Sequence, residues 1–311
     1  MYLNPSQSAP SYIHLHHQGL LQHRAETALA HLSQCEICPR ECGAERDGAE
    51  AGCCCTERYA RVVSYFPHRG EEKCLSGHNG SGTIFFAGCN LGCVFCQNSE
   101  LSQGDIGVEV TPQRLGEMML ELQELGCHNI NFVTPSHVVP QILEALPYAI
   151  QGGLNIPLVY NSSGYDRPDT LRLLEGVIDI YLPDFKLWDE SRCELYLNAN
   201  NYRKTAQAAV REMYRQVGSL RLDEHGLAQQ GLLVRHLLMP DALEDTGKIL
   251  RFLAEAVSTE TYINLMDQYY PAGQVSAQQY AEIDRCIQDD EKIKAMHLAS
   301  RLGLYRLDSL N

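Results

Sequence analysis

The sequence predicts an α/β protein: a partial (β/α)6 TIM-like barrel with a small cysteine-rich N-terminal extension. From residue 82 onward, short apolar runs of strand character alternate with amphipathic stretches of helical period. The cysteines concentrate in the first third of the chain, where ten of the thirteen lie within residues 35–96. We therefore divide the 311 residues into an extension with a cysteine-rich metal-binding segment, residues 1–80, and a barrel, residues 81–311.

Six apolar runs predict the strands of the barrel. They are residues 83–87, 130–133, 158–160, 177–182, 232–238 and 262–265. Helix starts between them are indicated by Thr111 with Pro112, by Arg167 with Pro168 and by Asp241 ahead of Leu243. This alternation favours parallel strands joined by right-handed crossovers, and six units instead of eight indicate an incomplete barrel. An open doubly wound sheet is the alternative.

The composition argues against several classes of protein. Asp and Glu number 39 against 25 Lys and Arg, and a net charge of −14 removes the electrostatic reason for binding nucleic acid. No run of 18 apolar residues predicts a membrane span, and the first 30 residues lack the apolar segment of a secretory signal. Thirteen cysteines are too sparse for a disulfide scaffold. We expect a cytoplasmic protein whose reduced thiols serve as metal ligands or as small core residues.

The loop after the first predicted strand carries three cysteines. Catalytic residues of parallel barrels lie where the strands end. Cys89, Cys93 and Cys96 follow the strand directly, at a C-x3-C-x2-C spacing that lets one short loop wrap a metal centre. Three thiolates would leave one iron of a four-iron cluster open for substrate or cofactor. The alternatives are a zinc site completed by a distant fourth ligand, and three packed cysteines without metal.

This motif, with Phe95 before its last cysteine and Asn98 after it, resembles the signature of the radical S-adenosylmethionine (SAM) superfamily. Later segments resemble the branch related to pyruvate formate-lyase-activating enzyme, namely residues 133–137, 160–165, 179–186, 235–237 and 262–266. The resemblance implies a 4Fe-4S cluster at Cys89, Cys93 and Cys96 whose open iron binds SAM. One electron then cleaves SAM to a 5′-deoxyadenosyl radical, which abstracts a hydrogen atom from the substrate. It further implies a reducing donor such as flavodoxin or ferredoxin, and a protein substrate of the glycyl radical enzyme kind.

Candidate contacts for SAM lie after the third and fourth predicted strands. Asp184 and Lys186 are two residues apart and point to the same side if the strand continues, so they can bind the ammonium and carboxylate of a methionine moiety. The pair resembles the Asp-x-Lys element of the activating enzymes; otherwise it is a salt bridge at the rim of the barrel. Asn161 and Ser163 are candidate ribose or carboxylate contacts, or ordinary turn residues.

The segment after the second predicted strand departs from the family pattern. Many radical SAM enzymes have a Gly-Gly-Glu-Pro element there, which binds the SAM amino group, whereas this chain has Thr134 followed by Pro135, Ser136 and His137. In the absence of that carboxylate, recognition of the amino group falls to Thr134, Ser136 or backbone carbonyls.

The N-terminal cysteines predict a second metal centre. Cys35, Cys38 and Cys42 are followed by a triple cysteine at 53–55, and four thiols at such spacing suit zinc or an iron–sulfur cluster. From the triple we choose Cys55 as the fourth ligand, with Cys53 next. The three cysteines beyond residue 100 lie among apolar neighbours and are interpreted as core thiols: Cys127, Cys193 and Cys286.

The main hypothesis is therefore a radical SAM enzyme. The alternative is a non-catalytic protein, either an iron–sulfur electron carrier or a zinc-stapled interaction protein. The position of the three-cysteine motif at a strand end favours the enzyme, whereas the presence of two cysteine motifs would suit the carrier. The sequence identifies neither the substrate nor the oligomeric state.

Overall fold

The computed structural model describes residues 10–48, 50–104 and 106–308. Within them, six parallel strands lie side by side in chain order in a nine-stranded sheet. They are β2 (Ser81–Phe86), β4 (Ile130–Val133), β5 (Leu158–Ser162), β6 (Ile180–Pro183), β8 (Ala228–Leu237) and β9 (Tyr262–Met266). Because the order never reverses, the sheet winds in one direction and forms a partial (β/α)6 TIM-like barrel, not a doubly wound sheet. The predicted fold class is confirmed.

All six predicted strands are present, and the starts of two of them shift by three residues or more. β6 begins three residues later than predicted, because Val177 and Ile178 donate backbone hydrogen bonds to Leu174 and close a turn instead. β8 begins four residues earlier, at Ala228. The apolar pattern thus located each strand, but the local turn decided where it started.

Three further strands extend the sheet with antiparallel pairing. They are β1 (Ala60–His68), β3 (Val108–Val110) and β7 (Arg221–Leu222). β1 pairs with both β2 and β3, so the sheet continues into the segment that the sequence assigned to the extension. β1 is largely half-buried, although its residues 62–66 form an apolar-rich run comparable to those of the parallel strands. Among the described residues no pairing joins β9 to the far edge, and the barrel stays open.

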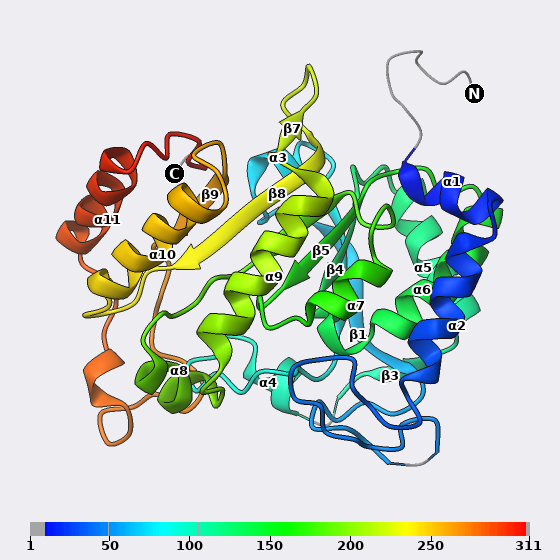
Figure 1. Cartoon of the computed structure of the whole chain (residues 1–311), viewed down its shortest axis with the longest axis horizontal. Coiled ribbons are helices and arrows are strands. Elements are labelled where there is room, and N and C mark those ends of the chain that lie inside the picture. The colour runs from blue at the N-terminus through cyan, green and yellow to red at the C-terminus, as the bar shows by residue number, and fades with distance from the viewer. Residues whose placement is uncertain (1–9, 49, 105, 309–311) are drawn as a thin grey trace.

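Eleven α-helices lie in the described residues, and those from α4 to α10 fall between the parallel strands along the chain (Figure 1). They are α1 (Ser11–His17), α2 (Leu20–Ala30), α3 (Lys73–Ser76), α4 (Ser99–Gln103), α5 (Pro112–Glu124), α6 (Val139–Gln151), α7 (Pro168–Leu173), α8 (Glu190–Leu197), α9 (Tyr202–Val217), α10 (Leu243–Ala256) and α11 (Asp289–Arg301), with short 3-10 turns at Pro135–His137 and Ala281–Ile283. None of the described helices is long and apolar enough to span a membrane.

The predicted helix starts are found at α5, α7 and α10. The side chain of Thr111 caps α5 by accepting a hydrogen bond from the Arg114 amide at 3.2 Å. α10 begins at Leu243 as expected, but its N-cap is Ala242 instead of Asp241. Asp241 adopts a left-handed backbone conformation, with φ of 55°, and its carboxylate pairs with Arg285.

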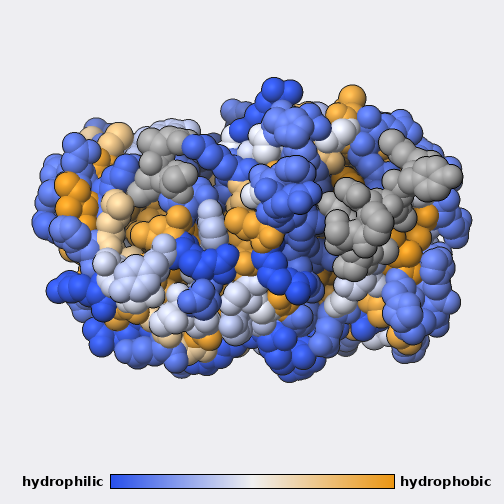
Figure 2. Space-filling view, turned by 90° about the horizontal axis from the view of Figure 1, so that it is seen from above, coloured by the Kyte–Doolittle hydropathy of each residue, from blue (hydrophilic) through white to orange (hydrophobic). Residues whose placement is uncertain are grey.

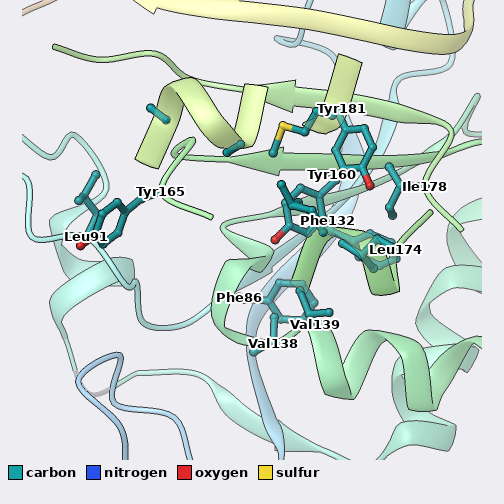
Figure 3. Packing of buried hydrophobic residues seen from close by; sticks show 14 of the residues in the cluster. Phe86, Leu91, Phe132, Val138, Val139, Tyr160, Tyr165, Leu174, Ile178 and Tyr181 are labelled. Atoms are coloured by element: carbon teal, nitrogen blue, oxygen red, sulfur yellow. The ribbon is translucent and has the colours of Figure 1, made fainter. Parts of the chain in front are cut away.

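The helix-facing side of the sheet is hydrophobic and aromatic. Alternate residues of a strand point to opposite faces, and β2, β4, β5 and β6 each place one aromatic ring on this side. Phe86 and Phe132 stack with ring centroids 6.3 Å apart, and Tyr160 meets Tyr181 edge to face at 5.7 Å. Figure 3 shows these rings packed against Val139 and other aliphatic side chains. This packing fixes the register of the strands whose ends carry the site.

The inner face of the sheet is apolar in one part and polar in another. A separate hydrophobic cluster on this face includes Leu75 from α3, Val159 and Ile180. Asn131 on β4 and Asn161 on β5 are also buried on this face, and Asn131 pairs directly with Val159. The outer surface is mainly hydrophilic where Figure 2 shows it, with hydrophobic residues in separate patches. Polar side chains therefore collect inside the barrel as well as outside it.

Candidate active site

The loop Gly88–Cys96 leaves the C-terminal end of β2 and carries three free thiols. Gly88 opens the loop with φ of 79°, a conformation that glycine adopts without strain. The sulfur of Cys89 accepts a hydrogen bond from the Leu91 amide at 3.3 Å, and the sulfur of Cys96 lies 3.3 Å from the Ser102 hydroxyl. The structure thus places the motif at the strand end where the sequence predicted it.

Backbone hydrogen bonds from two other segments anchor this loop. The amides of Gly92 and Val94 donate to the carbonyls of Leu197 and Tyr196 at the end of α8, at 3.2 and 2.9 Å. The carbonyl of Val94 accepts from the amide of Gln274, beyond β9, at 2.7 Å. The loop is therefore positioned by both halves of the barrel.

A cluster of charged side chains occupies the barrel interior near the loop. Lys186 Nζ lies 2.6 Å from Asp184 Oδ2, so the two side chains do share one side. Arg235, on β8, binds the other oxygen of Asp184 at 2.9 Å and donates to Asn161 Oδ1 at 2.5 Å. Its remaining nitrogen lies 3.6 Å from Glu71 Oε2. Asp184 thus pairs with two cations, and Lys186 has one carboxylate partner.

Burial and these ion pairs set the charges of the site. Burial opposes ionisation of Asp184 and Lys186, but their attraction outweighs it, so the pKa of Asp184 is lowered and that of Lys186 is raised. Burial raises the pKa of the Cys89 and Cys93 thiols to about 11 and about 12. A metal that binds these thiols must displace their protons. The Lys186 ammonium, which acts electrostatically on Cys93, favours the thiolate form.

The remaining predicted cofactor residues differ in their surroundings. Thr134 is half-buried in a left-handed conformation, and its amide donates to the Asn161 carbonyl at 2.9 Å. The Ser136 hydroxyl is buried close to Tyr160 and Asp166, and it has no hydrogen-bond partner of normal geometry among the described residues. Its neighbours thus differ from those of Asn161, whose side chain contacts Arg235.

Like Ser136, Ser163 has an unused polar group among the described residues. Its hydroxyl is buried and has no hydrogen-bond partner among the described residues. Its carbonyl accepts a hydrogen bond from the Tyr202 hydroxyl at 2.9 Å, and the same hydroxyl accepts from the Lys186 amide at 2.9 Å. Tyr202 thereby joins the ends of β5 and β6, which carry the candidate cofactor contacts.

The N-terminal cysteines gather beside the catalytic loop, but not in the predicted combination. Cys42 is in hydrogen-bonding contact with Cys35 and Cys53. Cys54 is buried, whereas Cys55 is exposed in a surface pocket with Glu57, Arg61 and Glu109. The structure therefore brings Cys54 toward the other thiols. Cys55, the ligand chosen from sequence, is instead exposed at the surface.

Two cysteines beyond residue 100 are core thiols as predicted, and one is not. Cys127 and Cys193 are buried. Cys286 is exposed, because Ile283 and Ile287 take the inward positions of that segment. The prediction of a core role for Cys286 was wrong.

The residues present fit a cluster and SAM chemically. Among the described residues, no three Cys, His, Asp or Glu side chains converge on a single metal ion. Three free thiols on one loop suit a polynuclear cluster, whose irons hold the sulfurs further apart. In the ion pair of Asp184 and Lys186, the carboxylate can bind an ammonium group and the ammonium can bind a carboxylate group. The Ser163 hydroxyl lacks a partner among the described residues.

The chain forms a partial parallel barrel with three free thiols after its first parallel strand and a largely buried ion pair nearby. This combination defines a class of enzyme that binds an iron–sulfur cluster and SAM. The chain belongs to the radical SAM superfamily, whose family model matches residues 83–253. The uncharacterized protein MJ0674 of Methanocaldococcus jannaschii is 31% identical over 296 residues, which span 92% of this chain and 80% of that protein.

Solved structures share the fold at low sequence identity. HydG, a maturase of the FeFe-hydrogenase, matches with a TM-score of 0.50 and 14% identity, over 71% of this chain and 48% of HydG. The chain thus spans about half the length of HydG, and the likeness shows the fold alone. TYW1 with a lysine-pyruvate adduct bound matches with a TM-score of 0.45 and 13% identity, over 71% of this chain and 72% of TYW1.

Sequence reasoning missed several residues that shape the site. Arg235 carries a recognisable signal, because a charged residue interrupts the apolar run of β8. Arg40 donates to the carbonyls of Asn90 and Asn198 at 2.8 and 2.6 Å and so ties the N-terminal segment to the catalytic loop. Nothing in the local pattern around Arg40 indicates these distant partners.

Proposed function

We propose that the chain cleaves SAM reductively at a cluster held by Cys89, Cys93 and Cys96, and uses the product to abstract hydrogen from a substrate. The proposal rests on one observation: three free thiols follow the first parallel strand, and the Lys186 ammonium acts electrostatically on two of them, Cys89 and Cys93. When bound there, a 4Fe-4S cluster and SAM supply a 5′-deoxyadenosyl radical.

The residues of the charged cluster have separate tasks in this proposal. Lys186 binds the carboxylate of SAM, and Asp184 binds the ammonium while keeping its bond to Arg235. Asn161, whose side-chain oxygen is already bonded to Arg235, and Ser163, whose hydroxyl is unpaired, offer further polar contacts. Thr134 supplies a polar side chain and a fixed backbone turn at the same edge. The buried surroundings exclude water from the reacting groups.

We further infer that the substrate is a partner protein, on which the enzyme generates a glycyl radical, and that flavodoxin or ferredoxin supplies the electron. The support is the resemblance of Asp184 and Lys186 to the Asp-x-Lys element of the pyruvate formate-lyase-activating branch. The charge of −14 is compatible with a protein partner recognised through specific contacts. We also propose that the N-terminal cysteines hold a second metal centre.

The test is anaerobic reconstitution with iron and sulfide, followed by reduction with dithionite in the presence of SAM. We expect release of 5′-deoxyadenosine, and loss of that release in Cys93→Ala. Cys286→Ala is the matched control, because that thiol is exposed and lies outside the site. A protein that holds only zinc, or a Cys93→Ala variant that still cleaves SAM, would overturn the proposal. Iron without SAM cleavage in the wild type would support the electron carrier instead.

A further inference from the structure

Arg46 is a fully buried cation without a carboxylate partner. Its side chain is 0% exposed, and among the described residues no carboxylate lies within ion-pair distance of it. The guanidinium donates to the carbonyl of Glu57 at 3.2 and 3.3 Å and to the carbonyl of His137 at 3.0 Å. Its other contact is the sulfur of Cys35, at 3.6 Å. A buried guanidinium stays charged and is unfavourable unless an anion compensates it.

The groups beside Arg46 that can carry negative charge are thiols. Cys35 accepts its hydrogen bond, and Cys54 lies within its electrostatic reach. Gly52 shows how closely they gather: a Cβ atom there would lie 3.4 Å from Cys54 Sγ, 3.5 Å from Cys42 Sγ and 3.5 Å from the Arg46 side chain. The sulfurs of Cys42 and Cys54 are therefore within about 7 Å of each other.

A fourth thiol completes this group. Cys38 is buried and acts electrostatically on both Cys35 and Cys54. Cys53 contacts only Cys42 of this set and is exposed, and Cys55 is exposed in the pocket described above. The four gathered thiols are thus Cys35, Cys38, Cys42 and Cys54.

We propose that Cys35, Cys38, Cys42 and Cys54 ligate a second iron–sulfur cluster, and that Arg46 is its buried counter-charge. Four thiolates give such a cluster the negative charge that the unpaired guanidinium requires. A single zinc ion would need its sulfurs within about 4 Å of one another, since each Zn–S bond is about 2.3 Å. No three side chains of the described residues converge in that way. An iron–sulfur cluster accepts the wider spacing.

The proposed cluster lies against the catalytic loop. The carbonyl of Cys54 would be 2.1 Å from a Cβ atom at Gly88, the residue before Cys89. Cys38 is in hydrogen-bonding contact with Asn90, and Arg40 donates to the Asn90 carbonyl at 2.8 Å. Figure 1 shows the segment that follows α2 along the same edge of the molecule as α4, which follows the catalytic loop.

From this position beside the catalytic loop we infer that the second cluster delivers electrons to the catalytic cluster. This inference rests on the proposed function. A reduced flavodoxin or ferredoxin donates one electron to the second cluster and is oxidised. The second cluster then passes that electron to the catalytic cluster and returns to its oxidised state. No atoms are transferred in either step.

Iron content tests the cluster itself, independently of SAM cleavage. Reconstituted wild type should hold about eight irons per chain, and Cys54→Ser about four. Cys53→Ser and Cys55→Ser are matched controls from the same tripeptide and should keep about eight. Cys93→Ala should lose the other four and retain the N-terminal Mössbauer signal, which shows that the fold survives. Zinc at this position, unchanged iron in Cys54→Ser, or loss of iron in Cys55→Ser would overturn the ligand assignment.

Two further measurements test Arg46 and the electron path. A nearby positive charge stabilises the reduced cluster, so Arg46→Met should shift the midpoint potential of the N-terminal signal downward and Arg46→Lys should restore most of it. In Cys54→Ser, the ratio of flavodoxin-driven to dithionite-driven 5′-deoxyadenosine release should fall at least tenfold. An unmoved potential would refute the role of Arg46, and an unchanged ratio would refute the electron path. If the wild type released no 5′-deoxyadenosine at all, the proposed function would fail while the iron counts still decided the cluster.

Discussion

Arg235 Nε lies 2.9 Å from Asp184 Oδ1, where β8 and the end of the neighbouring strand β6 form a β-bridge between these two residues. This contact keeps one oxygen of Asp184 occupied, while Lys186 binds the other. The carboxylate therefore stays ionised even though it is largely buried, and its pKa lies below the ordinary value because two cations outweigh the burial.

Lys186→Met should weaken SAM binding about tenfold or more, because a charge-assisted hydrogen bond contributes roughly 1.5–3 kcal/mol. The fold should persist, since Asp184 keeps its bond to Arg235. Equilibrium dialysis of reconstituted protein measures the dissociation constant for SAM. Lys248→Met is the control, because Lys248 pairs with Glu244 at 2.7 Å on the exposed face of α10. Equal affinity in wild type and Lys186→Met would refute the assignment.

Tyr202→Phe should lower the free energy of unfolding by about 1–2 kcal/mol, because it leaves the Lys186 amide and the Ser163 carbonyl without their shared partner. Urea denaturation monitored by circular dichroism measures the change. Tyr305→Phe is the control, since Tyr305 is 76% exposed and its substitution should change little. A loss of the same size in both variants would show that the Tyr202 hydroxyl does not stabilise the strand ends.

Gly88→Ala should destabilise the protein by several kcal/mol and reduce its iron content. The added Cβ would lie 2.1 Å from the Cys54 carbonyl oxygen, in a backbone conformation with φ of 79°. Gly226→Ala separates the steric clash from the backbone strain, because Gly226 has φ of 77° but no neighbour within 4 Å of an added Cβ. Thermal unfolding and iron analysis of both variants provide the check. The prediction fails if Gly88→Ala behaves like Gly226→Ala.

Asp179→Asn should stabilise the protein above pH 7. Burial raises the pKa of Asp179 to about 7, although the amides of Leu158 and Ser11 oppose the rise. Between the ordinary pKa near 4 and about 7, the folded state holds more protons than the unfolded state, so the stability of the wild type falls as pH rises. Asparagine does not ionise and can accept the hydrogen bond from Leu158, now 2.9 Å long.

The expected gain for Asp179→Asn is on the order of 2–4 kcal/mol at pH 8, shrinking to nothing near pH 4. Urea unfolding at several pH values measures it. Glu194→Gln, at an exposed position of α8, serves as the control and should stay within about 0.5 kcal/mol of wild type at each pH. A gain for Asp179→Asn that is independent of pH would rule out ionisation as its cause.

The fold class could be predicted because the parallel strands carry a local signal. Strands buried on both sides, such as β4 and β5, appear in the sequence as short runs in which apolar residues predominate. β1 has a comparable run at residues 62–66 but half-buried positions, and its antiparallel pairing with β2 emerged only in the folded chain. Partly buried strands depend on neighbours that are distant in sequence, and a local pattern does not record those neighbours.

The candidate site was partly predictable for a related reason. The cysteine spacing at 89–96 and the pair Asp184 and Lys186 are short-range patterns on one loop or strand end. Arg235 reaches Asp184 from another strand, and Arg46 reaches Cys35 through the turns of an irregular segment. These contacts join segments that the sequence does not connect.

The sequence by itself determined the alternation of strands and helices, the three-thiol loop at a strand end and the side shared by Asp184 and Lys186, since each depends on residues close together in the chain. The tertiary structure decided which member of the triple cysteine lies with the other N-terminal thiols, turning Cys54 inward and leaving Cys55 exposed. It also placed Arg46 in the interior, where no carboxylate of the described residues pairs with it. Adjacent residues of an irregular segment have the same local sequence but opposite orientations, and only packing against the rest of the molecule distinguishes them.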